Sequence, residues 1–377
     1  MENRNDDNIQ WELKGNTLYV NGTGAVRGGS RENLPDWFQN RKHVYRIVVG
    51  EGITELGPYG FAGMENVENT ELPSTLVRIG ASAFEDCYSL KNIEVPENVT
   101  VIDELAFMNC GNLRDVQLPF SLKKIGSFAF NRCNNLSKIK LPGQLRTIGS
   151  NAFSYSGLQE INFPEDIVEL GKGTLAGCIR LKDVQLPNSL RTIPKHTFAG
   201  CSSLKEIWIP DQVQVIEECA FMHCKNLSVI HLPVCVKCIK SFAFEDTSWL
   251  RNKEQELVTV NDILISGAKC FGEVKIPKGI RLIADNSFLE NDKITSVILP
   301  DSVKRIGKQA FFNCYQLKKI QTDSNLKVIE KFAFVKCPKL KKVTIPKSCK
   351  VERPAFDFGC KVTASKMKTK EESKPEL

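Results

Sequence analysis

Apolar and polar residues alternate over short stretches that return along the whole chain. In "LKNIEVP", Ile93 and Val95 alternate with Asn92 and Glu94, ahead of Pro96. A period of two predicts a short strand with one buried face. The proline has no N–H to donate, so it ends the hydrogen-bonded ladder. Each such stretch therefore predicts one short strand.

A second extended segment and an aromatic residue complete the unit. In "STLVRIG", Leu76 and Ile79 are expected to point inward along a second extended edge, and Phe84 is expected to fill the coil from the far side. The unit reads C-x-x-L-x-x-I-x-(L/I)-P-x-x-(L/V)-x-x-I-x-x-x-A-F. Its final position serves as a marker at Phe61, Phe84, Phe107, Phe130, Phe153, Leu175, Phe198, Phe221, Phe244, Phe288, Phe311, Phe334 and Phe356.

The marker recurs every 23 residues, apart from one interruption and two single-residue contractions. A fixed period of this length predicts a solenoid. One coil buries too little apolar surface alone, so neighbouring coils must stack. Equivalent strands then run parallel at ~4.8 Å. The expected fold class is a mainly-β, or α/β-type, repeat solenoid.

The recurring "IP…L..IG..AF..C..L..I" strings, from about Ile47 to Val362, resemble the BspA-like class of leucine-rich repeats. The resemblance implies a right-handed leucine-rich-repeat solenoid with a parallel β-sheet on its concave face. The start, "IQWELKGNTLYVNGTGAV", looks like the small β cap that precedes such arrays. Its own pattern predicts a hairpin, because apolar residues flank a Gly15-Asn16 turn.

These patterns divide the chain into three parts. Residues 1–46 form the β-hairpin cap, 47–362 the repeat solenoid and 363–377 a charged tail that we expect to be disordered. The interruption at about 245–276 resembles the hairpin inserts of this family, with "WLRNKEQE" as an exposed turn. We interpret it as a bulge in one solenoid.

The composition changes this picture little. Apolar residues make up 42% and charged residues 25%, as in ordinary globular proteins. No apolar run approaches the ~18 residues of a membrane-spanning helix. The net charge of +7 is spread along the chain, which argues against a nucleic-acid partner. The polar start lacks the pattern of a signal peptide, so we expect either a cytoplasmic location or a mature form whose leader has been removed. The resemblance implies secretion or the cell surface.

Most of the 14 cysteines belong to the repeat. The ladder cysteines lie three residues after the marker at Cys87, Cys110, Cys133, Cys178, Cys201, Cys224, Cys314 and Cys337. Stacking would bring neighbouring ladder residues within disulfide range. The same position also accepts Ser156, Thr247, Asn291 and Gly359, which indicates a small residue at a turn. We therefore expect the cysteines to be buried with free thiols.

The segment from Cys219 to Cys238 offers a metal-binding alternative. Its four cysteines and two histidines have the composition of a zinc site, with Cys219, Cys224, Cys235 and Cys238 as candidate ligands. These residues occupy repeat slots that point in different directions around a coil. We therefore expect no metal and no other cofactor, and the metal-binding protein remains an alternative hypothesis.

No pattern of residues predicts catalysis. The repeat places no Ser or Cys beside the histidines His43, His196, His223 and His231, and phosphate-loop and H-E-x-x-H motifs are absent. We expect no enzyme. Basic residues recur four positions after the repeat prolines and form a column when the coils stack: Lys123, Arg146, Arg191, Lys237, Arg281 and Lys304. This column is either a solvated edge that prevents wrong strand pairing or a site for an anionic partner.

The outward positions of the strands are free to recognise a partner. Most are polar, but Trp208 is not, and it should lie beside His231 on the next strand with Val229 diagonal to it. The candidate binding patch is Trp208, His231, Val229, Glu206 and Lys275. An exposed Trp is a typical interface anchor, although it could also lie flat on its neighbours. Acidic residues occupy the earlier strands, and Lys319 and Lys342 the last ones.

The predicted function is non-catalytic protein binding by a monomeric solenoid through its concave face. The resemblance implies adhesion to host matrix or cell-surface proteins, although the sequence does not name the partner. Three alternatives stay open: an intracellular scaffold, a Cys/His metal-binding protein or enzyme centred on residues 219–238, and a purely structural array with no specific partner.

Overall fold

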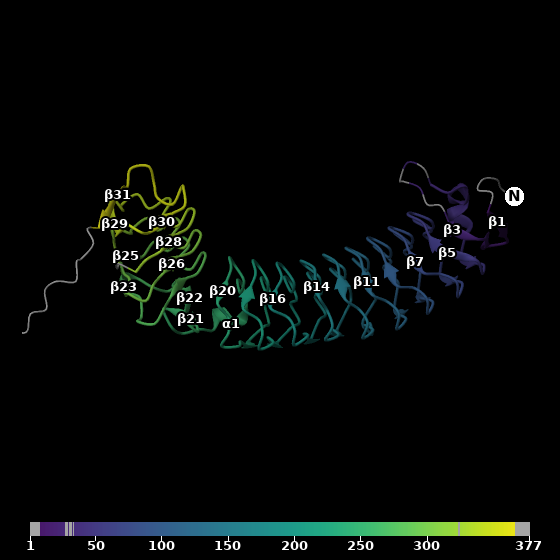
Figure 1. Cartoon of the computed structure of the whole chain (residues 1–377), viewed down its shortest axis with the longest axis horizontal. Helices are drawn as coiled ribbons and strands as arrows, with labels where there is room; N and C mark the ends of the chain where they lie inside the picture. The colour runs from purple at the N-terminus through teal and green to yellow at the C-terminus, as the bar shows by residue number, and fades with distance from the viewer. Residues whose placement is uncertain (1–7, 27–28, 30–31, 33, 323–324, 366–377) are drawn as a thin grey trace, which may run out of the picture. The chain divides into compact units, whose positions relative to one another are not determined.

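The computed structural model describes residues 8–26, 29, 32, 34–322 and 325–365 (Figure 1). The chain divides into two compact units. The first unit comprises Met1–Cys235 and Ala243–Asn252, and the second comprises Val236–Phe242 and Lys253–Leu377. The boundary between the units falls at the interruption of the repeat. Both units are built almost entirely of short parallel strands, as the repeat predicts.

The first unit begins with the predicted hairpin. Strand β1 (Ile9–Lys14) pairs antiparallel with β2 (Thr17–Gly22), and β2 pairs parallel with β4 (Arg46–Val49). A 3-10 helix, η1 (Asp36–His43), follows Pro35 and was not predicted. Its buried Trp37 donates an indole hydrogen bond of 2.8 Å to the carbonyl of Gly60. The hairpin and η1 thus cover the open edge of the first coil.

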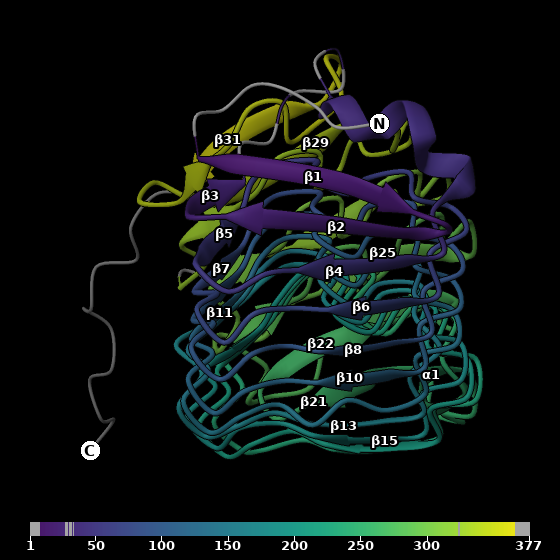
Figure 2. The ribbon, with the colours of Figure 1, turned by 90° about the vertical axis from the view of Figure 1, so that its right-hand side faces the viewer.

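Short strands with outward polar residues form one row, which we call the strand face. In the first unit it continues through β6 (Asn69–Glu71), β8 (Asn92–Glu94), β10 (Asp115–Gln117), β13 (Glu160–Asn162), β15 (Asp183–Gln185), β17 (Glu206–Trp208) and β19 (Val229–His231). Figure 2 shows strands of this row one above another. In β8, Ile93 is buried and its two neighbours are exposed, which confirms the predicted alternation.

A second row of strands lies along another edge of each coil. It runs through β3 (Gly24–Val26), β5 (Ile53–Leu56), β7 (Arg78–Ile79), β9 (Val101–Ile102), β11 (Lys124–Ile125), β12 (Thr147–Ile148) and β14 (Glu169–Leu170), and then β16 (Thr192–Ile193) and β18 (Val215–Ile216). Ile79 and Ile102 are fully buried in this row. The predicted second extended edge is confirmed.

The marker phenylalanines stack in the core between the two rows. The ring centroids of Phe84 and Phe107 are 5.3 Å apart with planes 5° from parallel, and both side chains are fully buried. Two residues with positive φ flank each marker from Phe61 to Phe334, for example Leu105 and Asn109 on either side of Phe107. These left-handed residues turn the chain sharply, so that the aromatic ring points inward.

The second unit repeats both rows after a hairpin. Strands β21 (Val258–Val260) and β22 (Ile263–Ser266) pair antiparallel. The second row of strands then continues through β24 (Leu282–Ile283), β26 (Arg305–Ile306), β28 (Val328–Ile329) and β30 (Lys350–Val351). The strand face of this unit comprises β23 (Gly272–Lys275), β25 (Ile294–Ile298), β27 (Lys319–Gln321), β29 (Lys342–Pro346) and β31 (Lys361–Ser365).

Two local features differ from the expectation. The start of "WLRNKEQE" is helical rather than an exposed turn, because α1 (Ser248–Arg251) is capped by Thr247, whose hydroxyl accepts a hydrogen bond from the backbone of Leu250. Strand β31 continues to Ser365, beyond the expected boundary at 362. The rest of the predicted tail, 366–377, lies outside the described residues.

Candidate functional site

The candidate patch is built on two neighbouring strands of the first unit. Strands β17 and β19 pair in parallel, with Glu206 opposite Val229 and Trp208 opposite His231. The central residues Ile207 and Ile230 are buried, so strand alternation turns the four flanking side chains outward. We call Glu206, Trp208, Val229 and His231 the Trp208 surface.

The side chains of the Trp208 surface hold one another in place. The indole of Trp208 and the imidazole of His231 stack with their centroids 3.5 Å apart and their planes 7° from parallel. The Nε2 atom of His231 donates a hydrogen bond of 2.6 Å to the carboxylate of Glu206. Trp208 nevertheless remains 67% exposed, and Val229 is also exposed. The outer face of the indole is therefore positioned but uncovered.

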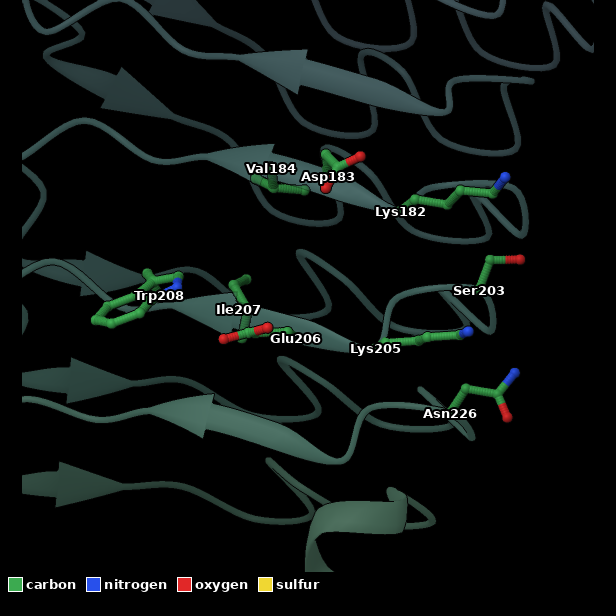
Figure 3. A pocket seen from close by; sticks show the side chains of 9 residues that line it. All are labelled: Lys182, Asp183, Val184, Ser203, Lys205, Glu206, Ile207, Trp208 and Asn226. Carbon is green, nitrogen blue, oxygen red and sulfur yellow. The ribbon is translucent and has the colours of Figure 1, made fainter.

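A hollow of about 530 Å³ lies beside this surface. It is lined by residues of three successive coils: Lys182, Asp183, Val184, Ser203, Lys205, Glu206, Ile207, Trp208 and Asn226. Figure 3 shows Trp208 on one side, with Lys182, Lys205, Ser203 and Asn226 along the other. The hollow thus combines one aromatic wall with groups of both charge signs.

Lys275, the remaining residue of the predicted patch, lies in the second unit. It ends β23, and its ammonium is 3.8 Å from Glu273 of the same strand. The Trp208 surface consists of residues of the first unit alone. We therefore treat Lys275 with the strand face of the second unit.

A second hollow of the first unit was not predicted from the sequence. It measures about 850 Å³ and is lined by residues of β10, of the next coil and of β13, including Phe120, Lys138 and Lys140. Phe120 is 65% exposed. Its position follows the repeat proline, where other coils carry Ser74, Glu97, Gly143, Glu165, Asn188, Asp211 or Val234. An aromatic residue in this mostly polar slot was the available signal.

The sequence profile of the BspA type leucine-rich repeat region matches residues 54–182, 146–264 and 252–363, with 6 copies of the repeat. These matches span more than half of the chain, and their coils are the ones that carry both strand rows. The chain belongs to the BspA-type leucine-rich repeat family. The resemblance inferred from the repeated strings is confirmed.

Two solved structures have the same fold. A leucine-rich repeat protein from Bacteroides ovatus ATCC 8483 is 23% identical, with a TM-score of 0.50 over 96% of this chain and 100% of that chain. A leucine-rich repeat protein from Eubacterium ventriosum ATCC 27560 is 19% identical, with a TM-score of 0.52 over 97% of this chain and 96% of that chain. No curated protein matches the chain. At these identities the likeness shows the fold.

The ladder cysteines of the BspA-type repeat are free and buried, as expected. Each thiol donates a hydrogen bond to the carbonyl of the marker residue in the preceding coil; that of Cys110 to Phe84, for example, is 3.2 Å long. Burial raises the pKa of the Cys178 thiol to about 11 and that of Cys87 further. The thiols of Cys178 and Cys87 therefore stay protonated at neutral pH, which makes them poor nucleophiles.

The proposed zinc ligands do not form a cluster. Cys224 donates to the carbonyl of Phe198, whereas Cys235 donates to the carbonyls of Asp211 and Val213. Cys219 is buried at another corner with positive φ, and Cys238 belongs to β20 (Cys238–Ile239) of the second unit. The described part of the chain contains no group of three or more His, Cys, Asp or Glu side chains that could hold a metal ion.

The basic column follows the second strand row. In the first unit, the backbone N–H of Arg146 donates a hydrogen bond of 2.9 Å to the carbonyl of Lys123 in the preceding coil. The guanidinium of Arg146 forms a salt bridge of 2.8 Å with the carboxylate of Asp166. In the second unit, the column runs from Arg281 and Lys304 onward to Lys327 and Lys350, the last two of which were not predicted. No helix within the described ranges is long and apolar enough to cross a membrane.

Proposed function

We propose that this chain is a non-catalytic protein-binding solenoid that recognises its partner through the Trp208 surface. The observation that carries the proposal is the combination of exposure and fixed orientation at Trp208. The ring is 67% exposed, yet it is stacked on His231, which is itself hydrogen-bonded to Glu206. An aromatic side chain held in this way loses little conformational entropy when a partner covers it.

The surroundings indicate what the partner presents. A partner that covers the indole would place an apolar or aromatic side chain against Trp208 and Val229. The hollow beside it offers Lys182 and Lys205 to acidic groups of the partner and Ser203 and Asn226 to its polar groups. Such an apolar centre with a polar rim is the usual anatomy of a specific protein interface. This supports a folded or extended protein as the ligand.

We further propose that the partner is an extracellular protein, such as a host matrix or cell-surface protein, and that binding serves adhesion. Membership of the BspA-type family supports this class of partner, because the resemblance implies adhesion. A partner from inside the cell would instead support the alternative of an intracellular scaffold. The two hypotheses share the same surface and differ in the source of the ligand.

A capture experiment tests the proposal. The full chain and a Trp208→Ala/His231→Ala variant serve as baits for host matrix proteins and, separately, for a bacterial lysate, with mass-spectrometric detection. Tyr155→Ala is the matched control, because Tyr155 is 58% exposed but lies on another edge of the coil. A matrix protein lost only with the double variant supports the proposal. A protein held equally by all three baits contradicts the choice of surface.

A further inference from the structure

The two units carry opposite charge. The first unit has 24 Lys and Arg against 29 Asp and Glu, and the second has 27 against 15. The net charge of +7 therefore hides a strongly basic second unit. This separation was not apparent from the total, and it raises the question of where the excess positive charge is displayed.

Much of it lies on the last three strands of the strand face. Lys342 of β29 lies directly opposite Lys361 of β31, and Lys319 of β27 occupies the same position one coil earlier. Lys318 and Lys341 precede two of these strands. All five side chains are exposed. We call Lys318, Lys319, Lys341, Lys342 and Lys361 the lysine cluster.

The lysine cluster has no acidic counterpart in the described part of the second unit. None of its five ammonium groups forms a salt bridge there. Glu273 is the acidic residue on this strand face, and it contacts Ser296 and Lys275 instead. By contrast, Lys91 in the first unit pairs with Glu68 at 2.6 Å. Like charges opposite each other on adjacent strands are destabilising, so the cluster is a surface that an anion would stabilise.

The geometry selects a linear anion. Strand spacing sets the lysines of successive coils ~4.8 Å apart, so the charges form a track across the strands. Each strand also presents a neutral polar group two residues later: Gln321, Thr344 and Thr363. The hydroxyls of Thr344 and Thr363 are 3.1 Å apart. A ligand that matches this surface carries repeated anionic groups beside repeated hydroxyl groups.

The residue types narrow the class further. Lysine acts as a compact point charge that binds anionic groups without the planar fork by which arginine grips carboxylates and phosphates. The cluster contains no arginine. Single-stranded nucleic acids require aromatic platforms for their bases, and β27, β29 and β31 contain no aromatic residue. We propose that the lysine cluster binds a linear sulfated polysaccharide, with sulfates on the lysines and sugar hydroxyls on Gln321, Thr344 and Thr363.

Binding of heparin oligosaccharides to the full chain tests this proposal. The variant Lys319→Gln/Lys342→Gln/Lys361→Gln removes the track. The matched control, Lys304→Gln/Lys327→Gln/Lys350→Gln, removes three lysines from the other strand row of the same unit. At about 0.15 M salt we expect the track variant to lose about tenfold or more in affinity, and the control to stay within about twofold of the parent.

Three results would overturn the proposal. They are a parent chain that does not bind heparin, equal losses in both triple variants, and a poly-glutamate or single-stranded oligonucleotide that binds as tightly as heparin. Hyaluronan, which carries carboxylates without sulfates, should bind more weakly than heparin. Trp208→Ala should leave heparin binding unchanged, so this inference stands or falls separately from the proposed protein-binding function.

Discussion

The thiol of Cys178 donates a hydrogen bond of 3.1 Å to the carbonyl oxygen of Phe153, the marker residue of the preceding coil. The same bond recurs along the ladder, for instance from Cys314 to Phe288 at 3.1 Å. Each ladder cysteine therefore links its coil to the one before it through a buried donor. The residues that replace cysteine bond differently: Thr247 donates to the carbonyl of Phe244 in its own coil, whereas Asn291 donates to the carbonyls of Gly267 and Cys270.

The buried thiols predict a loss of stability at alkaline pH. Burial raises the pKa of Cys178 from its ordinary value of 9.0 to about 11. The unfolded chain releases this proton at a lower pH than the folded chain, so the thiol's contribution is fully present below pH ~9 and is lost as pH rises toward ~11. For Cys178 alone the loss amounts to about 2–3 kcal/mol. Urea unfolding at pH 8 and pH 10.5 should therefore show a smaller difference between parent and Cys178→Ala at the higher pH. A pH-independent difference would contradict the assignment.

The phenylalanine stack predicts a large cost of truncation. Phe130 is fully buried between Phe107 and Phe153, at centroid distances of 5.2 and 5.5 Å. Phe130→Ala should lower the free energy of unfolding by about 3–5 kcal/mol, because it leaves a cavity between two coils. The exposed Phe120 is the control, and Phe120→Ala should change the same quantity by about 0.5 kcal/mol or less. Equal denaturant midpoints for the two variants would refute the core placement.

Asn291 fills the cysteine slot of its coil with four hydrogen bonds. Its amide nitrogen donates to the carbonyls of Gly267 and Cys270 at 2.9 and 3.0 Å, and its oxygen accepts from the backbone of Lys293 and Ile294. Asn291→Ala should destabilise the chain by at least about 2 kcal/mol, because buried backbone groups lose their partners.

Chemical denaturation followed by circular dichroism measures this cost. Ser296→Ala is the control in the same unit, because its hydroxyl makes one exposed hydrogen bond, to Glu273. If Asn291→Ala lowers the free energy of unfolding no more than Ser296→Ala does, the four hydrogen bonds contribute little to stability.

The lysine cluster predicts a gain in stability on neutralisation. Lys342 lies opposite Lys361 with no salt bridge in the described part of the unit. Lys342→Gln should therefore raise the free energy of unfolding by about 0.5 kcal/mol at low salt. The gain should disappear at about 1 M salt, where the charges are screened. Thermal unfolding at both salt concentrations measures it, with Lys278→Gln as the control. A destabilised variant would argue against repulsion within the cluster.

The sequence predicted the features that depend on periodicity. The alternation around Ile93 and the inward position of Ile79 follow from short-range patterns, and stacking of identical coils leaves little freedom in the arrangement of strands. The hairpin of the first residues was predicted for the same reason, because apolar residues flank the turn at Gly15. Local patterns therefore sufficed for both strand rows and for the core.

Features that depend on contacts between different coils were not predictable in this way. The role of the ladder cysteines requires the position of a carbonyl from the preceding coil, which no local pattern contains. The exposure of Phe120 and the helix at Ser248 depend on single departures from the repeat. At the candidate site, the neighbours of Trp208 were predicted, and a Trp lying flat on them was one of the two expected arrangements. The hydrogen bond between His231 and Glu206 required the structure.

The central claim is that Trp208 is the anchor of a protein-binding surface. The most direct test is the dissociation constant of a captured matrix protein for the parent chain, Trp208→Ala and Tyr155→Ala, measured by biolayer interferometry. A central interface anchor should cost about 2 kcal/mol or more, which is about thirtyfold in affinity, whereas Tyr155→Ala should leave the constant unchanged. Equal dissociation constants for the three proteins would contradict the claim.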